Sequence, residues 1–257
     1  MSDSSTLISH ISSTNHTNLH PDFGGNGAYG IPFMVVPASE PKVRINYTAY
    51  GDESDPGPFP IPSNAPIEGG ANSTGDRHVL VVQQGTCHLY ELGRAFWRTN
   101  HWDADVGVNW NLSSNALRTL GYTSADAAGL PILPGLVRYD EVQAGSVNHA
   151  IRFTAPLTQR GYIFPATHFA SSSTNPNLPP MGLRVRLKQS YDLSRFHGES
   201  LVILKAMKKY GMIVADNGSS WYFQGATDPR WNDNDLNQMK SVPGSAFEVV
   251  DNGPVHH

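Results

Sequence analysis

The stretch GESLVILKAMKKYGMIVADNGSSWYF, residues 198–223, has the clearest secondary-structure signal in the chain. Its first half places apolar residues at three- and four-residue spacings, which predicts a helix packed on a core. Gly211 can adopt the left-handed conformation that ends a helix, and residues 212–215 then predict a strand. Asn217-Gly218 is a dipeptide that two-residue hairpin turns prefer, with positive φ at Gly218. The stretch therefore predicts a helix, then a hairpin whose second strand covers residues 219–223.

The composition indicates the fold class of the whole chain. The 257 residues include 24 Gly and 19 Pro, and only 16% are charged. Many turn-forming residues with few charges are typical of short strands joined by ordered loops. We therefore expect a mainly β fold. It would be a single β-sandwich or jelly-roll-like domain over residues 31–257 with two or three short helices, preceded by an extended arm over residues 1–30.

Several classes of protein are disfavoured by the sequence. A net charge of −4 gives no general attraction to nucleic acid. The chain has no run of about 18 apolar residues, so we expect no membrane span. The G-x-S-x-G elbow, the P-loop, the dinucleotide-binding glycine motif and H-E-x-x-H are all missing from the sequence. These absences weigh against serine hydrolases, nucleotide-binding enzymes and zinc proteases of the standard types.

The composition also suggests export. The chain starts with the polar segment MSDSSTLISHISS, which lacks the basic and apolar regions of a secretion signal. N-x-Ser/Thr sequons occur at several positions, including Asn46 and Asn111. We expect an extracellular or periplasmic protein whose leader is absent from this chain.

Two ionisable residues fall on strand faces that are otherwise apolar. Residues 78–92, HVLVVQQGTCHLYEL, predict a hairpin that bends at Gln84-Gly85, and Glu91 follows Leu89 onto its apolar face. His149 similarly precedes Ile151 and Phe153 on one strand face. An ionisable group there is costly unless it is paired or used in catalysis. We expect Glu91 and His149 to share one cleft; the alternatives are a solvated strand end for Glu91 and a hydrogen-bonded core histidine for His149.

Aromatic and cationic residues supply candidate binding surfaces. Trp102, Trp221 and Trp231 either brace the core or stack against sugar rings. In GLRVRLKQS, residues 182–190, strict alternation predicts a strand that points Arg184 and Arg186 outward. That positive strand face either binds an acidic glycan or is simply solvated.

An acidic loop raises the question of a metal cofactor. The Pro/Gly-rich segment at residues 51–70 carries Asp52, Glu53 and Asp55, whose hard oxygen ligands suit calcium. The EF-hand pattern is missing, and a solvated acidic loop is the alternative. We expect no cofactor other than, at most, calcium.

Two long phrases resemble a known group of proteins. AGLPILPGLVRYDEVQAGSVNHAIRFTAP at residues 128–156 and YGMIVADNGSSWYFQGATDPRWNDNDL at residues 210–236 are similar to exported proteins of soil bacteria. The likeness covers most of the chain after residue 20. It implies export and one compact domain, and it brings no particular activity.

The leading functional hypothesis is an enzyme that degrades a polysaccharide or oligosaccharide. A glycoside hydrolase needs two carboxyl groups, about 5–5.5 Å apart for retention of configuration or about 6.5–9.5 Å apart for inversion. The candidates for these carboxyl groups are Glu91, Glu141, Asp216 and Asp228.

A uronate lyase is the second enzymatic hypothesis. Its cations would neutralise the substrate carboxylate, for which the candidates are Arg152, Arg184 and Arg186. Its base would be His149, or His168 in a predicted strand over residues 161–169. A non-catalytic glycan-binding or surface structural protein, which uses the tryptophans and the cationic strand, is the remaining alternative.

Overall fold

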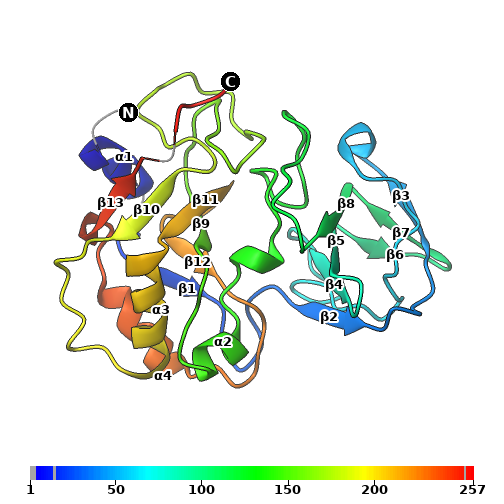
Figure 1. The fold of residues 1–257 in the computed structure, drawn as a ribbon, viewed down its shortest axis with the longest axis horizontal. Helices are drawn as coiled ribbons and strands as arrows, with labels where there is room; N and C mark the ends of the chain where they lie inside the picture. Colours follow the sequence, from blue (N-terminus) through cyan, green and yellow to red (C-terminus); the bar gives the residue numbers. More distant parts are fainter. Residues whose placement is uncertain (1–3, 14–15, 252) are drawn as a thin grey trace.

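The strands of the protein gather in two lobes that lie side by side in the computed structural model (Figure 1). The structure describes residues 4–13, 16–251 and 253–257. Strands hold more of these residues than helices do, and the helices are short. The predicted mainly β fold with short helices is therefore confirmed.

The first lobe contains seven of the strands. A four-stranded sheet has the order β2-β4-β5-β8, and a three-stranded sheet has the order β3-β7-β6. Their bounds are β2 (Phe33–Val36), β3 (Arg44–Tyr47), β4 (Val79–Gln83), β5 (His88–Gly93), β6 (Phe96–Trp97), β7 (His101–Ala104) and β8 (Val106–Asn111), with a short 3-10 helix η1 (Gly51–Glu53). Strands β4 and β5 form the antiparallel hairpin that the sequence predicts, with Leu80 opposite Glu91.

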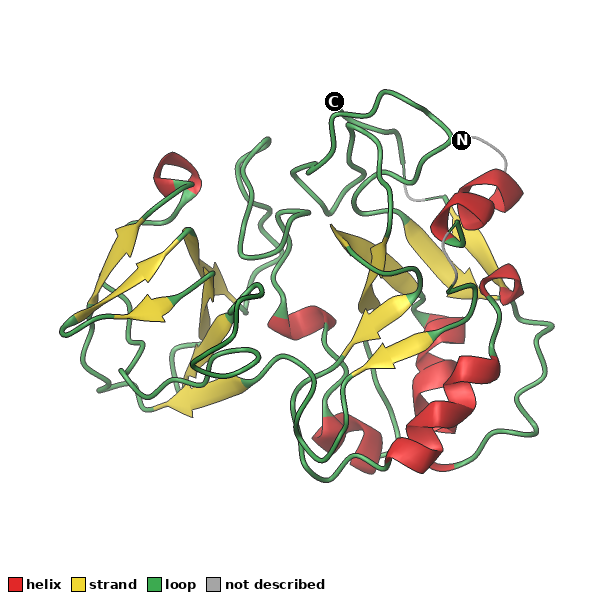
Figure 2. Cartoon of the chain, turned by 180° about the vertical axis from the view of Figure 1, so that it is seen from behind, coloured by secondary structure: helices red, strands yellow, loops and turns green. Residues whose placement is uncertain are grey.

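The second lobe is built on a mixed six-stranded sheet of order β1-β12-β9-β11-β10-β13. The strands are β1 (His20–Asp22), β9 (Ile151–Ala155), β10 (Arg184–Leu187), β11 (Met212–Asn217), β12 (Tyr222–Gln224) and β13 (Phe247–Val250). The helices are α1 (Ser4–Ile11), α2 (Tyr139–Gln143), α3 (Gly198–Lys209) and α4 (Asp233–Leu236), and the 3-10 turns are η2 (Leu133–Gly135), η3 (Asn237–Ser241) and η4 (Gly244–Ala246). Figure 2 shows the helices concentrated in this lobe.

Helix α3 and strand β11 follow the sequence prediction closely. The buried face of α3 includes Ile203, Leu204 and Met207. Gly211 ends the helical segment with a φ of +75°, and a Cβ atom there would lie 2.3 Å from the Val185 carbonyl oxygen. The left-handed conformation and the close backbone contact both explain why glycine follows the helix.

The predicted hairpin at Asn217-Gly218 is wrong. Strands β11 and β12 are not neighbours, because β9 lies between them and pairs parallel with β11 and antiparallel with β12. The chain must therefore cross the end of β9. The Thr154 hydroxyl donates to the Ser219 carbonyl at 2.7 Å and holds this crossing. Trp221, rather than Gly218, takes the positive φ, at 62°.

The described parts of the first thirty residues, 4–13 and 16–30, are less extended than the sequence predicts. Leu7, Ile8 and Ile11 of α1 are buried and belong to the core of the second lobe. Their one- and four-residue spacing places them on one helix face, which packs near β13. Burial of this apolar face stabilises the helix although the surrounding sequence is polar. Strand β1 adds a parallel edge to the sheet beside β12.

Both faces of the β4–β5 hairpin are buried. One face packs inside the first lobe and the other packs against the segment that leads to the second lobe. Tyr90 and Leu92 point into the core of the first lobe. Leu80 and Leu89 point the other way, into a second cluster with Ile132. Ile132 belongs to the connector, residues 112–150, which joins β8 of the first lobe to β9 of the second. None of the helices in the described ranges is both long and apolar enough to cross a membrane.

Candidate functional site

A cleft of about 580 Å³ lies where the two lobes meet. The first lobe contributes Arg94 and Asp105, and the second lobe contributes Arg160, His168 and Asp216. Connector residues 123–125 and 127 also line it. Ligand-binding clefts commonly have volumes of about 300–1,000 Å³, so this one has room for one or a few sugar rings.

Asp216 is the most perturbed acid that lines the cleft. It lies at an irregularity of β11, where the pairing with β9 shifts between Val214 and Asp216. Such bulges redirect a side chain from the regular alternation of the strand. Burial, aided by the nearby Asp126 charge and opposed by Arg152, raises the pKa of Asp216 to about 6. Asp216 can therefore hold a proton in weakly acidic solution and donate it.

An ion pair lies buried near Asp216. Arg152 of β9 donates from Nε and Nη2 to Asp126 Oδ2 at 3.3 and 3.1 Å. The side chains of Arg152 and Asp126 are 4% and 1% exposed. Arg152 also donates to the Gln224 side chain. These contacts place Arg152 away from solvent, so its predicted role in binding substrate directly is wrong; its positive charge instead acts on Asp216 from within the protein.

His168 lines the same cleft. The expected strand over residues 161–169 is replaced by a loop, in which Thr167 N donates to Ala128 O at 2.9 Å. Pro165 has no N–H to give to a sheet, which explains the loop. His168 Nδ1 lies 2.8 Å from the Ala127 carbonyl oxygen. A carbonyl can only accept, so Nδ1 carries the proton and Nε2 is the basic nitrogen of the neutral ring.

Two exposed arginines stand on the walls of the cleft. Arg94 Nη1 lies 3.5 Å from Asp105 Oδ2, and the Arg94 side chain is 62% exposed. The Arg160 guanidinium lies over the Phe169 ring at 5.6 Å from its centroid. Both are held by weak contacts, so they can turn toward an anionic group of a ligand.

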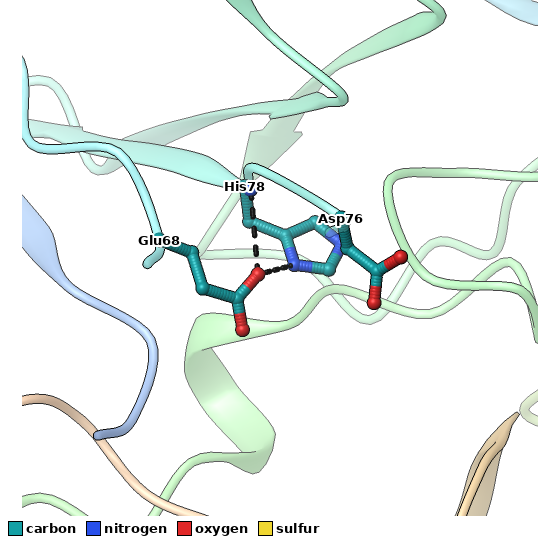
Figure 3. Close-up of side chains that lie close together, drawn as sticks. All are labelled: Glu68, Asp76 and His78. Atoms are coloured by element: carbon teal, nitrogen blue, oxygen red, sulfur yellow. Dashed lines mark hydrogen bonds and ion pairs between the residues drawn. The ribbon is translucent and has the colours of Figure 1, made fainter. Parts of the chain in front are cut away.

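A histidine that the sequence reading passed over also lines the cleft. His78 is buried between Glu68 and Asp76 (Figure 3). Its Nδ1 lies 2.6 Å from Glu68 Oε2, and its Nε2 lies 2.9 Å from the Ala125 carbonyl oxygen. Burial lowers the pKa of His78, but the hydrogen bond and the charge of Glu68 overcome this and raise the pKa to about 9. The only signal in the sequence was a polar D-R-H segment directly before an apolar strand.

Glu91 is fully buried, as its strand face predicts. Its carboxylate accepts from Ile132 N and Leu133 N at 3.0 Å each and from Trp110 Nε1 at 2.9 Å. Burial raises the pKa of Glu91 to about 7, although these three N–H donors oppose the rise. Glu91 therefore ties the connector to the sheet, and it is not among the residues that line the cleft.

His149 pairs with Glu141 instead of Glu91. His149 Nε2 lies 3.2 Å from Glu141 Oε2, and Arg138 Nη2 donates to Glu141 Oε1 at 2.5 Å. Neither His149 nor Glu141 lines the cleft. Because Glu91 and His149 have separate partners, the expected Glu91–His149 site is not formed in the described structure.

Asp228 belongs to a surface cluster outside the cleft. Its carboxylate accepts from Arg230 Nε at 2.9 Å and from Arg230 Nη2 at 2.6 Å. Arg230 also donates to Asp140 at 2.8 Å. Of the four predicted carboxyl groups, Asp216 is therefore the one that the structure brings into the cleft.

Of the two roles expected for the tryptophans, the structure bears out core bracing and contradicts stacking against sugar rings. Trp102 and Trp221 are 0% exposed and Trp231 is 4% exposed, so none of them presents a ring face to a sugar. Each indole N–H has an internal acceptor: Ile61 O, Ser12 Oγ and Ala226 O respectively. They brace the cores. Burial of a large aromatic ring is favourable once its indole N–H has a hydrogen-bond acceptor.

The alternation of β10 is confirmed, with Val185 and Leu187 buried. On the outer face, Arg186 Nε donates to Glu248 Oε1 at 2.7 Å, and Lys188 Nζ donates to Ser245 O at 2.9 Å. Arg184 is only partly exposed. Glu248 of β13 thus partly neutralises the cationic strand face.

The acidic loop at residues 51–70 uses Glu53 and Asp55, as well as Glu68, within the protein. Glu53 Oε2 accepts from Thr123 N at 2.7 Å. Asp55 accepts from Asn109 N at 2.8 Å and pairs with Arg118 at 3.2 Å. These contacts fasten the loop to the cleft region.

No protein-family model, curated protein or solved structure matches this chain.

Proposed function

We propose that this protein is an exported enzyme that cleaves a polysaccharide in the cleft between its lobes. One observation carries the proposal: Asp216, with a raised pKa, and His168, with a basic ring nitrogen, line the same cleft. Cleavage of a glycosidic bond needs a proton donor for the leaving oxygen and a base for the other reactant. These two residues supply both functions.

The favoured reaction is elimination from a uronate polymer. His168 Nε2 takes the proton from the carbon beside the uronate carboxylate, and the electrons of that C–H bond form a C=C bond as the C–O bond to the leaving sugar breaks. Asp216 then protonates the leaving oxygen. Arg94 and Arg160 favour this reaction over hydrolysis, because two cations on the cleft walls suit a substrate carboxylate and its developing negative charge.

Hydrolysis of a glycosidic bond is the related alternative, since Asp76 and Asp105 also line the cleft. Either could serve as the second carboxylate that hydrolysis requires. The two reactions give different products: elimination yields a new C=C bond together with a new reducing end, whereas hydrolysis yields the reducing end alone.

The test is a panel of acidic and neutral polysaccharides, assayed for both products. Asp216→Asn and His168→Asn should each lower kcat/KM by about 10²- to 10⁴-fold, the usual value of a general acid or base. Glu141→Gln is the matched control, because Glu141 pairs with a histidine outside the cleft. A polysaccharide that binds with no product formed would instead support a non-catalytic glycan-binding protein, and full activity in both variants would overturn the proposed site.

A further inference from the structure

Three potential metal ligands meet at one edge of the cleft. Figure 3 shows the His78 ring between the side chains of Glu68 and Asp76. One ligand atom from each residue lies within 4.8 Å of the other two. Asp76 and His78 both line the cleft, whereas Glu68 lies beside them.

The surroundings of the His78 ring require a cation at Nδ1. Nε2 faces the Ala125 carbonyl oxygen at 2.9 Å, and a carbonyl can only accept, so Nε2 carries a hydrogen. Nδ1 faces the Glu68 carboxylate at 2.6 Å, which also only accepts when ionised. The 2.6 Å gap between Nδ1 and Glu68 Oε2 has room for a second proton, and a metal ion that replaced this proton would move the two atoms to roughly 3 Å or more apart, because zinc lies about 2.0–2.2 Å from each ligand. A metal-bound histidine typically donates its other N–H to a carbonyl or carboxylate, as Nε2 does here.

Asp76 favours the metal over the proton. Its side chain is exposed at the cleft, and the described residues give its carboxylate no hydrogen-bond donor. With His78 doubly protonated, the cluster has one more negative than positive charge; with neutral His78 and a divalent ion, the charges balance. The exposed carboxylate also gives the ion a path from solvent.

We propose that Glu68, Asp76 and His78 bind one divalent first-row transition metal ion, such as zinc, through His78 Nδ1 and one or more oxygens of each carboxylate. Three protein ligands leave a coordination position open toward the cleft, as in catalytic rather than structural zinc sites. An imidazole ligand favours zinc, copper, iron or nickel over calcium and magnesium, which prefer all-oxygen sites. The proposal does not depend on the identity of the polymer.

The experiment is calorimetric titration of chelator-treated, full-length protein with zinc chloride, in excess magnesium and without any polysaccharide. Wild type should bind one zinc ion per chain. Asp76→Asn should weaken this binding by at least about tenfold, since even outer-shell partners of a metal are worth about 10- to 100-fold in affinity. Asp76 is exposed, so this variant should fold normally, and unfolding curves will verify that it does.

Asp105→Asn is the matched control, because it removes a carboxylate from the same cleft without touching the cluster. Its zinc affinity should equal that of wild type. If wild type binds no stoichiometric zinc, or if Asp76→Asn binds it as tightly, the proposal is overturned and a proton fills the Nδ1 position as a His78–Glu68 ion pair. Because zinc binding is measured without substrate, the result separates this proposal from the success or failure of the polysaccharide assay.

Discussion

Glu91 and Asp216 are two acids beside the lobe junction, and both have a raised pKa for the same primary reason, burial. They differ in what surrounds the carboxyl group. Glu91 is enclosed and accepts from three N–H donors. Asp216 accepts from its neighbour Asn217 N at 2.7 Å and faces a cleft. A perturbed pKa therefore does not distinguish a structural acid from a catalytic one; access and hydrogen-bond partners do.

The largest expected difference between the two acids is the loss of folding stability when each is replaced by alanine. Glu91→Ala should lower the free energy of unfolding by about 3–5 kcal/mol, because it leaves the N–H groups of Ile132, Leu133 and Trp110 buried without an acceptor. Asp216→Ala should cost about 1 kcal/mol or less. Urea unfolding at pH 7 measures both, and equal losses would contradict the distinction.

The pH dependence of stability sharpens the comparison. Glu91 has a pKa of about 7 in the folded protein against an ordinary value of 4.5, so the folded state keeps a proton that the unfolded state loses between these values. Stability should therefore fall as pH rises through this range, with Glu91 contributing up to about 3 kcal/mol. Unfolding curves across this range measure the fall.

Glu91→Gln should remove the Glu91 part of this dependence. Asp216→Asn should flatten the curve only over the lower interval, from about pH 4 to 6, because the pKa of Asp216 is raised to about 6. If neither variant changed the slope, both carboxyl groups would be ionised at the same pH as in the unfolded chain.

A smaller effect tests how rigidly the Asp216 end of β11 is held. A Cβ atom on Gly218 would lie 3.0 Å from Thr154 Cβ and Oγ1. Gly218→Val should cost about 1–3 kcal/mol by overpacking at this crossing. Gly75→Val is the control, since the nearest neighbour of its added Cβ is 3.7 Å away and Gly75 needs no positive φ. Thermal unfolding compares the two, and an equal change would show that the crossing is easily rearranged.

The smallest expected change in stability is for the solvent-exposed ion pair between Arg186 and Glu248. Arg186 and Glu248 are 45% and 35% exposed in their side chains, unlike the buried Arg152–Asp126 pair. Arg186→Ala should lower stability by about 1 kcal/mol or less, and less still in high salt, because water and ions screen the pair. Thermal unfolding at low and high salt measures this. A larger, salt-independent loss would show that β10 and β13 depend on the ion pair.

Local patterns in the sequence were enough to predict several elements. The spacing of apolar residues and Gly211 predicted α3 and β11, since helix periodicity and a left-handed stop act over a few residues. Alternation with a period of two predicted the inward face of β10 and the burial of Glu91. The β4–β5 hairpin was predictable because its two strands are joined by a short turn.

Tertiary structure alone decided which strands are neighbours. The insertion of β9 between β11 and β12 replaced the predicted hairpin, and nothing local to Asn217-Gly218 encodes a partner about sixty residues earlier in the chain. The tryptophans were buried for a similar reason: their surroundings come from distant segments, as in the contact of Trp221 with Ser12.

The candidate site likewise exists only in the folded chain. Asp216 and His168 were recognisable as ionisable residues, but their sequence neighbours do not show that they line one cleft with Arg94. His78 gave still less signal, because its partners Glu68 and Ala125 lie 10 and 47 residues away. Periodicity fixes which way a side chain points from its own helix or strand, whereas burial, pKa and access depend on the groups that the fold brings around it.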